Sequence, residues 1–235
     1  MVSASLAFIE ELLTSLLDLH TFLEGKVVLQ RKRCSILDDV LRPVATMLSS
    51  QGSPGLEISV ETDDPLWVEA DPVKLKQLVM NLGKNAVKFV PSGFVRIGAK
   101  REGPNRVVLW VADSGPGVDP LKAVTLFDMY TQCDVEDQGT GIGLALVRQI
   151  AEASGGTAWL DPEYVSGSPE HGPGSRFVAT LSLAEAPAAD VTIVTNDGDD
   201  GDSIALLRGP YRVLIVDDDF IPNKYDLITI DNVSY

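Results

Sequence analysis

The stretch Asn81-Leu-Gly-Lys-Asn85-Ala-Val-Lys88-Phe89 predicts a helix with two distinct faces. Asn81, Asn85 and Lys88 stand at positions i, i+4 and i+7, so they fall within roughly 60° of one another around a helix. Amide oxygens suit a hard cation such as Mg²⁺, and an ammonium suits a phosphate. A solvated polar face without a ligand is the alternative interpretation of this run alone. An apolar stripe about 100° away predicts packing on a core: Leu75, Leu78, Val79, Leu82, Ala86 and Phe89.

Two glycine-rich segments follow this helix along the chain. Asp113-Ser-Gly115-Pro-Gly117 comes directly after Val107–Ala112, an apolar run that predicts a buried strand. A carboxylate at the end of a strand can accept a hydrogen bond from an exocyclic amine, such as that of adenine. Gly139-Thr140-Gly141-Ile142-Gly143-Leu144 opens a predicted helix that runs to Ala153. Glycines there let phosphate approach backbone N–H groups near a helix N-terminus. Either segment alone could be an ordinary turn, so their order is the specific signal.

In this order the motifs resemble those of the ATP-binding domain of sensor histidine kinases, within the superfamily that includes gyrase, Hsp90 and MutL ATPases. Asn81–Phe89 resembles the N box of that family, and Asp113–Gly117 resembles its G1 box. Leu126–Gln132 resembles the F box, and Gly139–Leu146 the G2 box. The resemblance covers about residues 10 to 183. It implies an α+β fold, a two-layer α/β sandwich in which three helices cover one mixed sheet.

The resemblance also implies a site for ATP with Mg²⁺. It implies that Asn85 binds Mg²⁺, that Asp113 recognises adenine, and that Asn81 and Lys88 act in catalysis beside the phosphates. The ATPase relatives carry a water-activating Glu where this chain has Asn81. Because an amide cannot accept a proton from water, fast hydrolysis is not expected. The remaining implied ATP contacts are Gly115, Gly117, Val118, Phe127, Gly139, Thr140, Gly141, Ile142, Gly143 and Leu144.

Residues 118 to 138 are expected to form a lid over the nucleotide, and this lid departs from the family pattern. Many relatives carry an Arg or Lys in the lid that reaches the phosphates. Here Lys122 is the lid's one cation, and residues 133–138 hold three carboxylates and no basic side chain.

The composition of the chain limits the classes of molecule that it is expected to bind and the compartment that it suits. The chain has 235 residues and a net charge of −15, which argues against a nucleic-acid-binding surface. Two cysteines, Cys34 and Cys133, form no disulfide framework and fit a reducing compartment. Without an apolar run near 18 residues or a signal peptide, we expect a soluble, cytoplasmic chain that makes no membrane contact, although a longer parent could be membrane-bound.

The N-terminal residues 1–27 are expected to be a remnant of a dimerisation hairpin. Leu6–Leu23 carries leucines at helical spacing and resembles the second helix of that hairpin in histidine kinases. The first helix, which bears the phosphoacceptor histidine, has no counterpart here. His20 lies among leucines and is interpreted as a packed side chain. The resemblance implies a homodimeric parent, with the acceptor hairpin supplied by another chain or by that parent.

Residues 28–184 are expected to form the ATP-binding domain, followed by an acidic flexible linker at 185–210. Residues 211–235 resemble an incomplete response-regulator receiver, in which Asp217 and Asp218 match the acidic pair and Asp231 the phospho-accepting aspartate. Only residues 220–224 separate the two receiver-like strands, whereas a parallel pair needs a crossover of about a dozen residues or more. We expect this tail to be non-functional, and truncation after Leu183 to leave thermal unfolding nearly unchanged.

The hydrophobic periods predict the elements of the domain. A helix is expected from Ser35 to Met47 with Ser35 as its cap, and another begins after the Asp71-Pro72 pair. The expected strands are 56–60, 66–68, 94–100, 107–112, 157–160 and 176–183.

Together these features predict the ATP-binding catalytic domain of a hybrid sensor histidine kinase, which transfers the γ-phosphoryl group of ATP to a histidine in a two-component phosphorelay. The alternative is a degenerate nucleotide-binding regulatory module without kinase activity. A self-standing ATPase is disfavoured, because Asn81 stands in place of the general base.

Overall fold

The computed structural model of the chain describes residues 29–62, 66–123, 125–128, 141–168 and 170–186. The predicted hairpin remnant with His20, most of the acidic linker, and the receiver-like tail with Asp217, Asp218 and Asp231 lie outside these ranges. Gly139 and Thr140 of the G2 box also lie outside them. Among the described helices, none combines the length and the apolar character needed to span a membrane.

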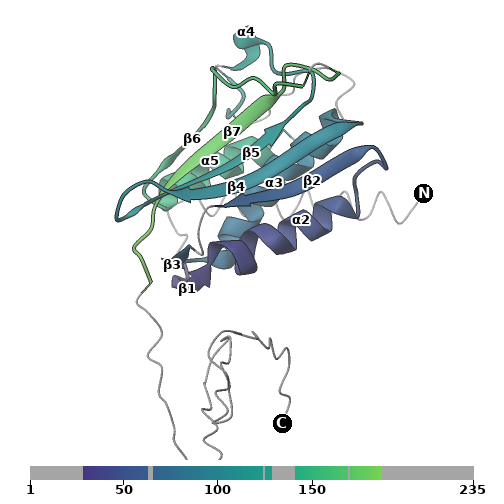
Figure 1. The fold of residues 1–235 in the computed structure, drawn as a ribbon. Helices are drawn as coiled ribbons and strands as arrows, with labels where there is room; N and C mark the ends of the chain where they lie inside the picture. The colour runs from purple at the N-terminus through teal and green to yellow at the C-terminus, as the bar shows by residue number, and fades with distance from the viewer. Residues whose placement is uncertain (1–28, 63–65, 124, 129–140, 169, 187–235) are drawn as a thin grey trace, which may run out of the picture. The chain divides into compact units, whose positions relative to one another are not determined.

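A five-stranded mixed sheet forms the centre of the domain, in the order β2-β4-β5-β7-β6 (Figure 1). Strands β2 and β4 are parallel, and the other neighbouring pairs are antiparallel. The expected strands 94–100 and 107–112 are both present and pair with each other, with Ile97 opposite Val111. The bounds are β2 Leu56–Thr62, β4 Gly93–Arg101, β5 Arg106–Asp113, β6 Thr157–Leu160 and β7 Ser175–Ser182.

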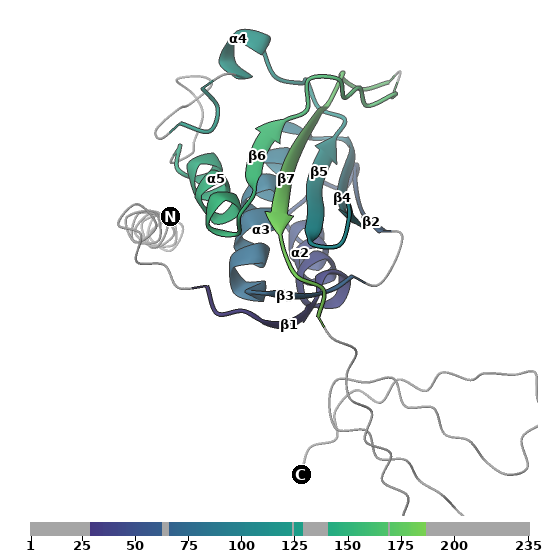
Figure 2. The ribbon, with the colours of Figure 1, turned by 90° about the vertical axis from the view of Figure 1, so that its left-hand side faces the viewer.

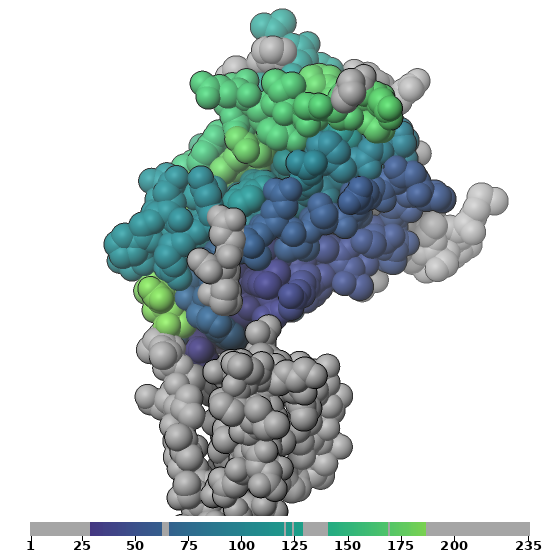
Figure 3. All heavy atoms as spheres, viewed as in Figure 1, coloured from purple at the N-terminus to yellow at the C-terminus, as the bar shows by residue number. Residues whose placement is uncertain are grey.

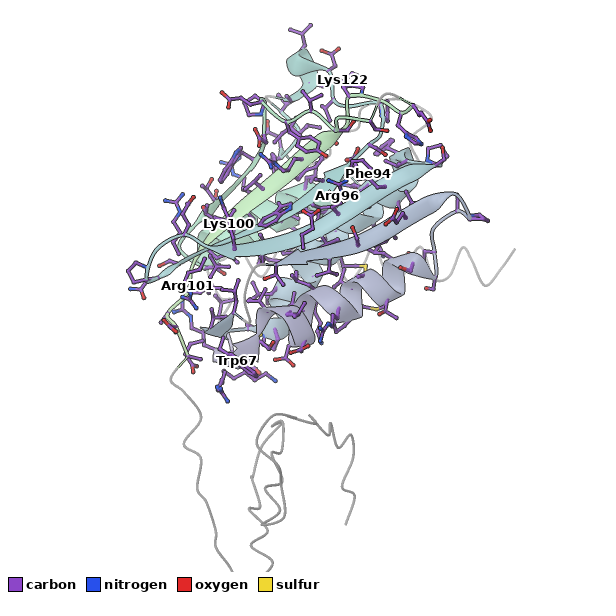
Figure 4. All side chains as sticks on the ribbon, in the orientation of Figure 1. Trp67, Phe94, Arg96, Lys100, Arg101 and Lys122 are labelled. Atoms are coloured by element: carbon purple, nitrogen blue, oxygen red, sulfur yellow. The ribbon has the colours of Figure 1, made fainter. Side chains whose placement is uncertain are left out.

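Three helices cover one face of the sheet: α2 (Arg42–Ser49), α3 (Pro72–Phe89) and α5 (Gly143–Ala153), as Figure 2 shows. Alternate residues of the strands point toward them, and Ile97 and Leu109 share one buried core with the helices. The strand residues between those face the opposite side of the sheet, whose outer surface Figure 3 shows. Arg96 of β4 is one of them and is exposed (Figure 4). The predicted two-layer α+β fold is confirmed.

Helix α3 begins as the sequence predicts. The Asp71 carboxylate caps it by accepting the N–H groups of Val73 (3.0 Å) and Lys74 (3.2 Å), and Pro72 occupies the first turn. The predicted apolar stripe is buried except at Phe89, which is 43% exposed. Phe89 is the last residue of the helix, and the Lys88 ammonium lies 4.8 Å from its ring centre.

The predicted helix from Ser35 is present, but it is not uniform. Ser35 caps it by accepting the Asp38 N–H at 3.1 Å, and Ile36–Leu41 then form a π-helix before α2 begins. Pro43 has no N–H and its ring would crowd the carbonyl of Asp39 in a regular α-helix. The wider turn of the π-helix accommodates this proline. The spacing of apolar residues alone did not predict the π-helix.

A small second sheet closes the domain below the main one. Strand β1 (Lys32–Ser35) pairs antiparallel with β3 (Trp67–Ala70), and Val68 on the other side of β3 forms a bridge with Glu185. The Glu69 N–H donates to the Ala184 carbonyl (3.0 Å), and the Ala186 N–H donates to the Trp67 carbonyl (3.1 Å). Neither β1 nor this pairing was predicted, and the pairing takes in the first two residues of the predicted linker.

This pairing changes the expectation for truncation. Removal of residues after Leu183 deletes both hydrogen bonds to β3, each of which contributes about 0.5–1.5 kcal/mol net. For a domain of this size, about 1–3 kcal/mol corresponds to a fall in the unfolding midpoint of roughly 3–10 °C. Truncation after Pro187 keeps the pairing and serves as the matched control in scanning calorimetry. Equal midpoints for the two truncations would contradict the contribution of residues 184–186.

Candidate nucleotide-binding site

Asp113 is the last residue of β5, and the residue is buried, with 5% of its surface exposed. Oδ1 accepts the N–H groups of Gly115 (2.8 Å) and Ser175 (3.3 Å), and Oδ2 accepts the Ser175 hydroxyl (2.5 Å). Burial raises the pKa of this carboxyl, and the hydrogen bonds from Ser175 and Gly115 oppose that rise. A carboxylate has about four acceptor positions. Within the described residues, three are used, and one position on Oδ2 is left for a ligand.

Ser175 is a site residue that the sequence analysis did not identify. It is the first residue of β7 and stands opposite Asp113 in the β5–β7 register, although 62 positions separate the two in the chain. The Gly172-Pro-Gly174 turn just before it was the available signal. The role of the hydroxyl depends on the strand register, which the turn alone does not reveal.

The loop that follows Asp113 is held by this same turn. Gly172 donates its N–H to the Ser114 carbonyl (3.0 Å), and Gly174 donates to the Gly115 carbonyl (2.9 Å). At Gly117 the backbone has φ +78°, the left-handed region that favours glycine, so the chain can turn sharply after Asp113. The carboxylate is therefore fixed both by its own hydrogen bonds and by the backbone around it.

Helix α3 lies beside both this loop and the start of α5. A methyl group placed on Gly115 would lie 2.8 Å from the Val90 side chain, just past the end of α3. A methyl group on Gly143 would lie 3.4 Å from Oδ1 of Asn81, in ordinary contact. The two glycine segments thus meet α3 at points nine residues apart, about 13 Å along the helix. Between them lie Asn85, which is half-buried, and Lys88, which is exposed.

The N-terminus of α5 has the features of an anion site. Ile142 precedes the helix and provides no side-chain hydrogen bond to its first N–H groups. Gly141 before it has φ +65°, so the backbone turns into the helix where a side chain would be strained. The N-terminus of an 11-residue helix carries partial positive charge, which attracts anions. Gly143 and Leu144 are half-buried at this end.

The predicted F-box residue Phe127 packs onto the edge of the core. Its ring meets that of Phe177 edge to face, with centroids 6.2 Å apart, and Leu126 beside it is buried. Val118 also packs against the core. These contacts fix both ends of the described part of the predicted lid, whereas Lys122 lies on the short helix α4 (Pro120–Ala123) at the upper end of the domain (Figure 4).

A metal at this site would depend on the nucleotide. Among the described residues, no group of three His, Cys, Asp or Glu side chains could hold a metal ion. Protein sites for Mg²⁺ commonly use one or two protein ligands together with substrate phosphates. A single amide oxygen at Asn85 fits a metal that arrives with phosphates and does not fit a permanent metal centre.

Comparison with known proteins also indicates a nucleotide-binding domain. The family described as histidine kinase-, DNA gyrase B-, and HSP90-like ATPase matches residues 70–185. The circadian input-output histidine kinase CikA of Synechococcus elongatus is 32% identical over 166 residues, which are 67% of this chain and 22% of that protein. Sensor protein TorS of Escherichia coli is 30% identical over 190 residues, 76% of this chain and 20% of that protein. The chain thus spans about a fifth of the length of these curated relatives.

Two solved structures extend the comparison. Full-length ShkA in complex with AMPPNP has a TM-score of 0.67 at 30% identity, over 76% of this chain and 36% of that one. The catalytic domain of histidine kinase ThkA has a TM-score of 0.56 at 24% identity, over 66% of this chain and 97% of that one, which shows likeness of fold. Residues 70–185 are therefore an ATP-binding domain of the histidine kinase-, DNA gyrase B- and HSP90-like ATPase family, related to those of sensor histidine kinases.

Proposed function

We propose that this chain is the ATP-binding catalytic part of a hybrid sensor histidine kinase, and that it presents the γ-phosphoryl group of ATP to a histidine outside this chain. The proposal rests on one observation: two groups suited to a nucleotide both lie beside α3. One is the Asp113 carboxylate, which keeps one acceptor position open among the described residues, and the other is the N-terminus of α5 beside Asn81. The complex of the related ShkA with AMPPNP supports a nucleotide as the ligand.

In this proposal the residues divide into three groups. Asp113 accepts a hydrogen bond from the exocyclic amine of adenine, with Gly115 and Gly117 shaping the loop around the base. The N–H groups from Gly141 to Leu144 bind phosphate, and Lys88 adds positive charge. Asn85 would hold Mg²⁺, which supplies neutralisation of the charge on the phosphates. The domain then acts by positioning and electrostatics, and Asn81 does not activate water.

The first test concerns the metal. Asn85→Ala is expected to weaken Mg-ATP roughly tenfold or more, because an interaction with a charged group is typically worth about 1.5–3 kcal/mol. Metal-free ATP should be weakened far less, since an amide oxygen aimed at the metal matters only when the metal is present. Calorimetric titrations with Mg²⁺ and with EDTA measure both. Asn85→Asp keeps an oxygen ligand and is the control, and equal losses under the two conditions would reject Asn85 as a ligand.

The second test concerns transfer. Phosphotransfer needs a nucleotide site, an acceptor nitrogen and a geometry that brings them in line. The chain alone is therefore expected to bind γ-labelled ATP without labelling itself, and to hydrolyse it slowly. Addition of an acceptor hairpin from a related kinase should give acid-labile label on the hairpin. Acid-labile label on the isolated chain that disappears with His20→Ala would contradict the interpretation of His20 as a packed side chain.

The second candidate is a nucleotide-binding regulatory module without transferase activity. The acidic residues 133–138 favour it, because they place carboxylates where many relatives carry a cation for the phosphates. ATP binding without transfer to any supplied hairpin would support this candidate over the kinase. In either case the partners are a hairpin and a receiver from another chain or from a longer, dimeric parent.

A further inference from the structure

Strand β2 forms one edge of the main sheet, and among the described residues no strand pairs with its outer side. It has seven residues, whereas β6 at the opposite edge has four. Figure 1 shows β2 as the last strand of the sheet, beside α2. Alternate N–H and C=O groups of an edge strand point away from the sheet, so β2 offers a row of backbone groups to a further strand.

The side chains that β2 turns toward the helices are only partly covered. Ile58 and Val60 are half-buried, whereas the residues opposite them on β4, Val95 and Ile97, are fully buried. Together with Leu56, which is also half-buried, they pack against the margin of the core. A further strand with apolar residues at the matching positions would complete the burial of these three side chains.

On its other face β2 carries two exposed carboxylates, Glu57 and Glu61. The residue opposite Glu57 on β4 is Phe94, which has no charge, and Glu61 lies 3.6 Å from Nε of Arg96. Figure 4 shows Phe94 and Arg96 on this face of the sheet. Helix α2, which packs on the other face, carries one charged residue, Arg42, and this arginine pairs with a carboxylate of the preceding turn. The outer margin of β2 is therefore negative.

These carboxylates disfavour a second copy of the chain as the added strand. The antiparallel register that pairs the whole of β2 with its copy places Ser59 opposite Ser59, so each Glu57 stands opposite a Glu61. Like charges directly opposite each other destabilise a strand pair. Charged side chains protect an edge strand from pairing with itself in this way. The same two carboxylates favour a strand with lysine or arginine at those positions.

We propose that the outer edge of β2 binds an extended basic segment of another protein, which adds a sixth strand to the five-stranded sheet. The segment places aliphatic side chains over the margin of the core and lysine or arginine beside Glu57 and Glu61. Backbone hydrogen bonds supply the affinity, and the alternation supplies the specificity. By register, Ile58 lies two strands from Asp113, about 10 Å away. The docked segment therefore leaves the predicted adenine position open and requires no nucleotide.

An NMR titration of the isotope-labelled full chain tests the proposal. The probe is a capped peptide as long as β2 that alternates valine with lysine. We expect shifts of amide signals in β2 and at Gly52, which lies next to the side chains of Leu56 and Ile58, together with slower hydrogen exchange in β2. The control is a peptide of the same composition in which all lysines precede all valines. Absence of shifts in β2, or equal binding of the two peptides, would overturn the proposal.

A charge reversal tests the role of the two carboxylates. Glu57→Lys together with Glu61→Lys should weaken the valine–lysine peptide by about two- to thirtyfold, the range expected for two opposite-charge pairs across strands. The same variant should bind a valine–glutamate peptide more tightly than the parent chain does. Both positions are exposed, and unchanged amide signals in β5 and β7 show that the fold is kept.

Three outcomes would reject a basic partner segment at this edge. The first is an unchanged affinity for the valine–lysine peptide in the charge-reversed variant. The second is a set of shifts confined to the acidic residues 187–207, which would show attraction to charge without pairing. The third is shifts in β2 that grow with chain concentration in the absence of peptide, which would assign the edge to a second copy.

Discussion

Asp113→Asn is expected to lower the affinity for ATP roughly tenfold or more while the fold stays intact. Asparagine has the same shape, so its amide oxygen can accept the N–H groups of Gly115 and Ser175, and its NH₂ group can donate to the Ser175 hydroxyl. The remaining position on Oδ2 then presents a donor where the carboxylate presents an acceptor. Adenine's amine is itself a donor, so the variant loses a charge-assisted hydrogen bond of about 1.5–3 kcal/mol.

The same substitution should stabilise the protein without nucleotide at neutral pH. Burial raises the pKa of Asp113 above its ordinary value of 3.8, so the folded state disfavours the ionised form. The contribution of Asp113 to stability is therefore fully present only below its unfolded pKa and is lost as pH rises through its folded pKa. A neutral asparagine avoids this loss. The unfolding midpoint of Asp113→Asn should exceed that of the parent at neutral pH, and the difference should vanish below pH 3.8.

Calorimetric titration with ATP and GTP, together with thermal unfolding, distinguishes binding from folding at this position. Glu57→Gln, the same loss of charge at an exposed residue of β2, is the control and should affect neither measurement. An unchanged ATP affinity in Asp113→Asn, or equal binding of ATP and GTP by the parent chain, would count against adenine recognition by this carboxylate.

Gly174→Ala should destabilise the domain by about 2–5 kcal/mol and weaken nucleotide binding with it. The backbone at Gly174 has φ +77°, where an L-residue costs roughly 1–2 kcal/mol. The added methyl group would lie 2.1 Å from the carbonyl oxygen of Asp113, so the backbone on one side must move. Overpacking of this kind costs typically about 1–3 kcal/mol. The movement displaces the strand end that carries Asp113, the residue proposed to bind adenine.

Gly167→Ala is the matched control for this effect. Gly167 has φ +69° but no atom within 4 Å of the position that a methyl group would take. It therefore carries the backbone cost without the contact. The difference in unfolding free energy between the two variants, measured in urea, isolates the cost of crowding Asp113. Equal destabilisation by the two substitutions would show that the close approach of Gly174 to β5 can relax freely.

The sequence predicted the elements whose signals are local. The Asp71-Pro72 start, the stripe of α3 and the alternation of β4 and β5 all lie within a few residues of one another, and each is present in the structure. The prediction that Phe89 is buried with the stripe was wrong. The spacing of apolar residues does not show where a helix extends beyond the core that it packs on. In the structure Asn81 and Gly143, which belong to two of the predicted motifs, lie close together.

The features that were missed depend on pairing across long stretches of chain. Strand β1 is only the four residues Lys32–Ser35, without clear alternation, and it exists because β3 offers an edge. Ser175 acquires its role only through the register of β7 with β5. Residues 184–186 look like the start of a linker by composition, yet backbone groups pair with β3 whatever side chains they carry. The individual nucleotide contacts stay predictions, which the substitutions above test.

The small sheet has a mechanical consequence for this domain. Strand β1 and residues 184–186 both run antiparallel to β3, so they run in the same direction on either side of it. The start of β1 lies opposite Ala70, whereas Ala186 donates to Trp67 at the other end of β3. Tension between the segments before β1 and after residue 186 therefore pulls along β3 in opposite directions and loads its hydrogen bonds in shear. That load path runs through β1, β3 and residues 184–186 and does not include α3 or β5, which carry the predicted nucleotide-binding residues.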